Sequence, residues 1–114
     1  MFHILVVEDD PNARRLMRAV LERAEYNVST AENGNAALEW MDAHHVDLIV
    51  LDVMMPGMDG YALTRDLRAS GYDLPILMVT AKQLPADKRM GFLVGTDDYM
   101  TKPVDTEEML LRIK

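Results

Sequence analysis

The stretch "IVLDVMMPGMDG", residues 49–60, decides how this chain folds. An aliphatic run ends on a single carboxylate, Asp52, and a methionine pair and a Pro-Gly turn follow. Together with residues 47 and 48, the run is typical of a central parallel strand that is covered on both faces. Packing gives such a strand no use for an acid at its end. The position of Asp52 therefore indicates that the carboxylate itself has a function.

The segments on either side of this stretch repeat one pattern. Short apolar runs alternate with segments in which apolar residues recur every three or four positions, which predicts strand-helix units around a parallel sheet. Asp10 and Pro11 are typical of a helix cap and first turn, and Gly71 of a helix end. We predict strands at 3–7, 27–31, 47–52, 75–80 and 97–101, and helices from residue 11 and at 35–43, 61–70, 85–94 and 105–114.

Length and composition limit the range of functions. A chain of 114 residues supports one core. With 12 Lys and Arg against 19 Asp and Glu, its net charge of −7 argues against nucleic-acid contact by this domain. It has no cysteine, which excludes disulfides and thiol chemistry. The apolar run Ile4 to Val7 is too short for a signal peptide or membrane span, so we expect a cytoplasmic protein without membrane contact.

Polar residues follow the predicted strands at the points where they end. In an open parallel sheet these ends meet at one edge, where ligands bind. Several carboxylates at one place repel one another, and a divalent cation removes that conflict. Oxygen ligands without Cys or His favour Mg²⁺ over zinc, and a carboxylate can itself be phosphorylated. We therefore expect a magnesium and phosphoryl site formed by Glu8, Asp9, Asp52, Thr80 and Lys102.

Four motifs, in order, carry a family resemblance: "ILVVEDD" (4–10), "DLIVLDVMMPGMDG" (47–60), "ILMVTA" (76–81) and "DDYMTKP" (97–103). Over essentially the whole chain, they resemble the receiver domain of bacterial two-component response regulators. The resemblance implies a flavodoxin-like (βα)5 doubly wound parallel sheet of strand order 2-1-3-4-5. It also implies one receiver domain, residues 1–114, that is cut within its fifth helix and lacks its output domain.

The resemblance assigns roles to the residues at this edge. Asp52 would accept a phosphoryl group from a sensor histidine kinase. Asp9 would bind Mg²⁺ directly, Glu8 would hold a metal-bound water, and the backbone carbonyl of Met54 would complete the set. The domain would act as a phospho-acceptor that promotes its own phosphorylation and dephosphorylation, and not as an enzyme of the usual kind.

Three further residues would act on the phosphorylated form. Lys102 would pair with a phosphoryl oxygen, and the Thr80 hydroxyl would donate to another. The resemblance implies that Thr80 and Tyr99 form the switch, because the ring of Tyr99 turns inward when Thr80 moves toward the phosphoryl group.

A finer resemblance concerns an output face. In the winged-helix OmpR/PhoB class, charged pairs between the fourth helix, fifth strand and fifth helix hold a phosphorylated homodimer, and a C-terminal domain binds DNA. Thr96 and Val104 depart from the pattern common in that class, and they bear on dimer geometry more than on the chemistry. The matching charges here are Lys88, Asp97, Asp98, Glu108 and Arg112.

Three alternatives remain beside this interpretation. A haloacid-dehalogenase-type phosphatase, which also depends on Mg²⁺ and forms an aspartyl-phosphate, carries a second acid two residues after its nucleophile, where this chain has Met54. A flavodoxin-like cofactor binder needs a phosphate loop after the first strand, and the acids of "EDDPN" would repel phosphate. A degenerate receiver would act as a phosphorylation-independent interaction module, and the complete set of site residues argues against it.

Overall fold

The computed structural model describes residues 2–52, 60–80, 98–101, 110 and 113. Its centre is a five-stranded parallel sheet of order β2-β1-β3-β4-β5. The sheet confirms the predicted doubly wound, flavodoxin-like arrangement. The strands are β1 (His3–Val7), β2 (Asn27–Ala31), β3 (Leu48–Asp52), β4 (Ile76–Thr80) and β5 (Asp98–Thr101), and the helices are α1 (Pro11–Arg23), α2 (Gly34–Ala43) and α3 (Gly60–Ala69).

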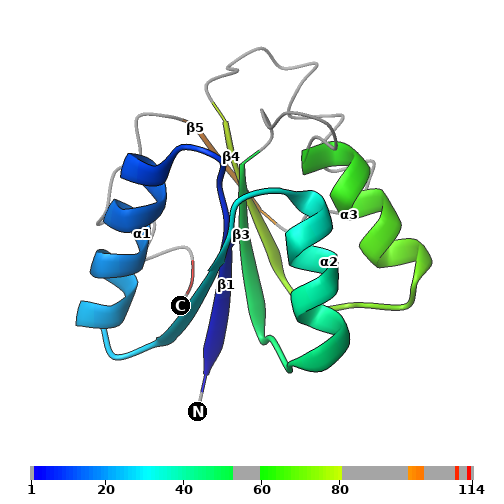
Figure 1. Ribbon diagram of the computed structural model, residues 1–114, viewed down its shortest axis with the longest axis horizontal. Coiled ribbons are helices and arrows are strands. Elements are labelled where there is room, and N and C mark those ends of the chain that lie inside the picture. The colour runs from blue at the N-terminus through cyan, green and yellow to red at the C-terminus, as the bar shows by residue number, and fades with distance from the viewer. Residues whose placement is uncertain (1, 53–59, 81–97, 102–109, 111–112, 114) are drawn as a thin grey trace.

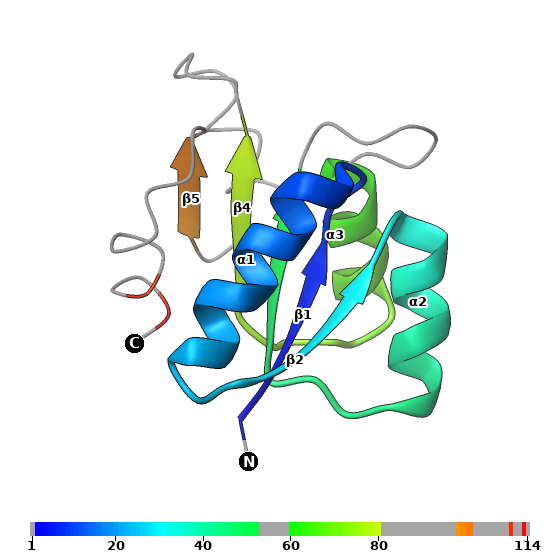
Figure 2. The same cartoon turned by 60° about the vertical axis from the view of Figure 1, so that its left-hand side comes forward.

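The helices cover both faces of the sheet. Helix α1 lies on one face and helices α2 and α3 lie on the other (Figure 1). A view turned by 60° shows the strands pointing the same way, so that their carboxyl ends share one edge (Figure 2). Among the described residues no helix combines the length and apolar character needed to cross a membrane.

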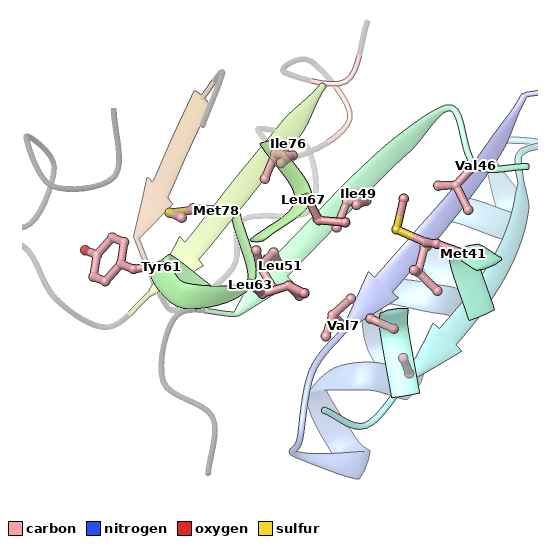
Figure 3. Packing of buried hydrophobic residues seen from close by; sticks show 13 residues of the cluster. Val7, Met41, Val46, Ile49, Leu51, Tyr61, Leu63, Leu67, Ile76 and Met78 are labelled. Carbon is pink, nitrogen blue, oxygen red and sulfur yellow. The ribbon is translucent and has the colours of Figure 1, made fainter. Parts of the chain in front are cut away.

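Alternation along the strands divides the core into two halves. In β1, Ile4 and Val6 join the cluster on the α1 side, while Leu5 and Val7 join the cluster on the other side. Strands β3 and β4 alternate in the same way, because successive side chains of a strand point to opposite faces. This explains why their sequences are aliphatic throughout. Figure 3 shows the half that helices α2 and α3 cover.

Side-chain caps fix where the first two helices begin. Asp10 accepts a hydrogen bond from the amide of Asn12 at 3.0 Å, and Pro11 occupies the first turn of α1, as predicted. Asn33 caps α2 by accepting from the amide of Ala36 at 2.8 Å. This cap places Gly34 inside the helix, so α2 begins one residue earlier than the sequence pattern predicted.

Several other boundaries differ from the predictions by one residue. Strand β3 begins at residue 48 instead of 47, β4 at 76 instead of 75 and β5 at 98 instead of 97, while α3 runs from 60 to 69 instead of 61 to 70. Gly71 follows α3 with a φ of 90°, a conformation that favours glycine at a helix end. The predicted helices at 85–94 and 105–114 lie outside the described residues, apart from Leu110 and Ile113, which pack against the α1-side cluster.

Asp47 links the amino ends of β1 and β3. Its carboxylate accepts a hydrogen bond from the amide of His3 at 2.8 Å, and its own amide donates to the carbonyl of His3, also at 2.8 Å. The second carboxylate oxygen lies 2.7 Å from Nε2 of His45. The His3 amide first, and the His45 side chain second, hold the pKa of Asp47 below its ordinary value of 3.8.

This lowered pKa predicts a pH-dependent contribution to stability. Because the folded-state pKa of Asp47 lies below the unfolded value of 3.8, its contribution is present above that pH and is lost as the pH falls through the folded pKa. We expect Asp47→Asn to lower the free energy of unfolding at neutral pH and to differ little from the native chain once the native carboxyl is protonated. Urea unfolding over a pH series measures the free energy of unfolding of the native chain and of the variant.

The matched control is Asp42→Asn, which neutralises an exposed acid near the end of α2. We expect it to change the free energy of unfolding far less than Asp47→Asn does at neutral pH. An Asp47→Asn deficit that stayed constant across the acid range would contradict the proposed role of the carboxylate charge.

Candidate functional site

Three carboxylates meet at the carboxyl edge of the sheet. Glu8 and Asp9 follow β1, and Asp52 is the last residue of β3. Each offers an oxygen, and these oxygens all lie within 4.8 Å of one another. Glu8 is 0% and Asp52 2% exposed, whereas Asp9 is accessible to solvent. The predicted acidic cluster therefore forms, with two of its members buried.

Strand register explains why these acids meet. Strands β1 and β3 are neighbours, and Val7 pairs with Leu51. The next residues along the chain are therefore Glu8, directly after β1, and Asp52, the last residue of β3. Two sequence-distant acids come together because two parallel strands end at the same level. Asp52 also pairs with Val79 of β4, so it sits between two other strands in the middle of the sheet.

Hydrogen bonds that involve its backbone groups hold the acidic segment on both sides. The amide of Glu8 donates to the carbonyl of Ala31 at 3.0 Å, which ties the segment to β2. The guanidinium of Arg14 donates to the carbonyl of Glu8 at 2.8 Å, which ties it to α1. The amide of Asp9 donates to a carboxylate oxygen of Glu8 at 3.1 Å. Buried polar groups of this kind need such partners, and here they fix the direction of the chain.

The three consecutive acids of "EDD" have separate tasks. Glu8 and Asp9 contribute to the cluster, while Asp10 points to the first turn of α1 and caps it. Sequence reasoning assigned the cap correctly, but it did not single out Arg14. The available signal was its spacing: Arg14 lies one helical turn after Asp10, and helical side chains lean toward the N-terminus, over the segment that carries the acids.

The other predicted site residues are described only in part. Thr80 ends β4 next to the strand of Asp52, and its backbone pairs with Thr101 of β5. Tyr99 lies within β5, where it pairs with Met78, and Asp98 begins that strand. The predicted residues outside the described part of the chain are Met54, Lys88, Asp97, Lys102, Glu108 and Arg112.

The donor set fits a hard divalent cation. It consists of carboxylate oxygens from Glu8, Asp9 and Asp52, which suit Mg²⁺ and similar ions better than zinc or copper. Two of these carboxylates are nearly inaccessible to water, so a cation would offset the repulsion that their proximity creates. Asp9 is the member of this cluster that solvent reaches.

Comparison with known proteins identifies the family. Residues 4–114 match the response regulator receiver domain, so the chain belongs to this family of signalling receiver domains. It is 43% identical over 112 residues to the "Probable transcriptional regulator ycf27" of Cyanidium caldarium, a match that covers 98% of this chain and 45% of that protein. Relatives of this kind are consistent with the OmpR/PhoB class.

Solved structures agree with this assignment. The receiver domain of the Francisella response regulator 1452 is 30% identical, with a TM-score of 0.95 over 99% of this chain and 93% of that one. The response regulator TrrA from Thermotoga maritima, solved in complex with Mg²⁺ and BeF, is 32% identical, with a TM-score of 0.89 over 99% of this chain and 96% of that one. Receiver domains bind Mg²⁺ at an acidic pocket, and this chain has an acidic cluster of Glu8, Asp9 and Asp52.

Proposed function

We propose that this chain is a phosphorylation-controlled switch of the cytoplasm, in which Asp52 accepts a phosphoryl group from a sensor histidine kinase with the help of Mg²⁺. The observation that carries the proposal is the meeting of Glu8, Asp9 and Asp52 within 4.8 Å at the carboxyl edge of the sheet. An isolated buried acid would be costly, whereas three acids that share one cation form a site for a phosphate group.

The proposed reaction is a phosphoryl transfer to a carboxylate. An oxygen of Asp52 forms a bond to phosphorus while the bond from phosphorus to the donor breaks, and the donor keeps that electron pair. A bound Mg²⁺ would neutralise charge on the transferring group. Asp9 would bind the ion directly, Glu8 would bind it through a water, and the carbonyl of Met54 would be a further ligand.

The family resemblance supplies the remaining roles as proposals. Lys102 and Thr80 would contact oxygens of the transferred group, and Tyr99 would follow the movement of Thr80. The charge of the phosphoryl group would then favour one of two conformations of the domain. The shift could be no larger than the difference between the interaction energies of this group in the two conformations. This population shift would be the first step of the signal.

The proposed output is the control of transcription. The chain spans about half the length of the curated relatives it matches. We propose that residues 1–114 are the receiver domain of a longer transcriptional regulator whose other part binds DNA. In the phosphorylated form, two receivers would dimerise through charges at Lys88, Asp97, Asp98, Glu108 and Arg112.

The first experiment is intact mass spectrometry after incubation with acetyl phosphate, with and without Mg²⁺. We expect a gain of one phosphoryl group that requires Mg²⁺, because the carboxylates alone would repel the donor. Retention of the native mass under all conditions, with Mg²⁺ binding intact, would contradict the proposal and would favour the phosphorylation-independent interaction module.

A further inference from the structure

Arg14 is a cationic residue next to the acidic cluster that the proposed chemistry leaves unused. It lies on α1, is half-buried, and donates from Nη1 to the carbonyl of Glu8 at 2.8 Å. The other hydrogen-bonded arginines of this helix contact their own helix. Arg15 donates to Asn12 at 2.6 Å, and Arg18 pairs with Glu22 at 3.4 Å. Arg14 alone among these three reaches back to the segment that carries the site.

The contact fixes the backbone at Glu8 from one side. The amide of Arg14 bonds to the carbonyl of Asp10 at 2.9 Å in the first turn of α1, so the Arg14 backbone is anchored where the helix begins. Its side chain therefore leans over residues 8–10. The Glu8 amide is held from the other side by Ala31 of β2 at 3.0 Å. Both peptide groups that flank Glu8 are therefore held, which restrains the backbone position from which its carboxylate reaches the cluster.

The position of Glu8 also influences the position of Asp9. The Asp9 amide donates to the Glu8 carboxylate at 3.1 Å, so the two acidic residues form one hydrogen-bonded unit. This unit faces Asp52, which the register of β3 holds independently. The distance between the two halves of the cluster thus depends on the position of the β1–α1 segment, and Arg14 is its tether to α1.

We propose that Arg14 is a positioning residue for the divalent-cation site, which holds the Glu8–Asp9 unit in the arrangement that receives the ion. The proposal rests on the proposed function only for the identity of the ion. For the affinity of the site for a cation, a positioning role and simple electrostatics predict opposite effects of removing Arg14. A positive charge near a cation site should weaken cation binding, so its removal should strengthen binding. If Arg14 positions the acids, its removal weakens binding instead.

The test is the affinity for Mg²⁺ alone, measured by isothermal titration calorimetry without a phosphodonor. The variant Arg14→Met keeps most of the apolar stem and removes the donors. We expect its Kd for Mg²⁺ to rise about tenfold, since loss of a partner that orients metal ligands commonly costs 10- to 100-fold in affinity. Arg14→Lys keeps the charge and can donate to the same carbonyl, so we expect it to restore most of the affinity.

The matched control is Arg15→Met, which makes the same change in charge and side chain at the next residue of α1. Its side chain contacts Asn12 and not the acidic segment, so we expect a Kd within about twofold of the native value, as for a solvent-screened surface charge. Thermal unfolding of each variant establishes that it is folded at the titration temperature. If Arg14→Met unfolds there, Arg14→Gln, which is too short to make the same contact, replaces it.

The outcomes separate the two proposals. If the native chain and Arg14→Met bind Mg²⁺ equally well, or if Arg14→Met binds it more tightly, the positioning role is wrong while the phosphorylation proposal stands. If Arg14→Met binds more weakly but the native chain accepts no phosphoryl group, the positioning role stands and the proposed function is wrong. If the native chain binds no Mg²⁺, both are wrong.

Discussion

Asp52→Asn is expected to gain no phosphoryl group from acetyl phosphate under Mg²⁺ conditions in which the native chain gains one. The amide that replaces the carboxylate is a poor nucleophile toward phosphorus, and the substitution also removes one of the three acidic ligands. Asparagine has nearly the same size, so the packing at the end of β3 is kept. Intact mass spectrometry reads out the result directly.

The control for this experiment is Asp10→Asn. Asp10 lies two residues from Glu8 and carries the same charge as Asp52, but its side chain caps α1. Asparagine caps a helix about as well as aspartate does. We therefore expect Asp10→Asn to gain the phosphoryl group at a rate within about twofold of the native rate. A gain of mass by Asp52→Asn equal to that of the native chain would place the acceptor elsewhere.

The largest expected loss of stability comes from Leu21→Ala in α1. Leu21 is 0% exposed and lies in the core cluster between α1 and the sheet. Its truncation removes buried methyl groups and leaves a cavity, which commonly costs about 2–5 kcal/mol. For a domain of this size we expect the Tm to fall by roughly 10 °C or more. Thermal and urea unfolding measure both quantities.

The same helix supplies the matched control. Leu16 is 50% exposed, so Leu16→Ala removes the same atoms from the surface of α1. We expect a change within about 0.5 kcal/mol, because surface substitutions rarely exceed this and alanine is also a strong helix former. Similar losses for both variants would mean that the helix contributes through its propensity and not through its packing.

The fold was predictable because its signals are local. Apolar runs marked the strands, a period of three to four residues marked the helices, and Asp10, Pro11 and Gly71 marked their ends. The meeting of Glu8, Asp9 and Asp52 followed from the rule that parallel strands present their carboxyl ends at one edge. These features follow from local sequence patterns and from the general geometry of parallel sheets, without knowledge of particular side-chain contacts.

What the sequence did not predict depends on such contacts. Asp47 was assigned to β3, but its carboxylate instead bonds to the amide of His3, a contact across 44 positions that no periodic pattern encodes. The sequence pattern also gave no sign that His45 contacts Asp47 or that His3 contacts Ser29. For Arg14, the only signal in the sequence was its spacing of one helical turn from Asp10. The hydrogen bonds of His3 to Asp47 and to Ser29 join strands that become neighbours only when the sheet forms. The contacts of His45 with Asp47 and of Arg14 with Glu8 are local, and they depend on side-chain directions that the sequence pattern does not give.

The alternation of side chains along β3 also limits the insertions and deletions that this strand tolerates. Asp52 lies an even number of residues after Leu48 and Val50, which belong to the α1-side cluster. The residues between them, Ile49 and Leu51, belong to the cluster on the opposite face of the sheet. One residue inserted or deleted within this strand would exchange the two faces and move Asp52 away from Glu8. The same shift would exchange the aliphatic side chains between the two halves of the core. A register shift in β3 would therefore disturb the core packing and the position of the acid together.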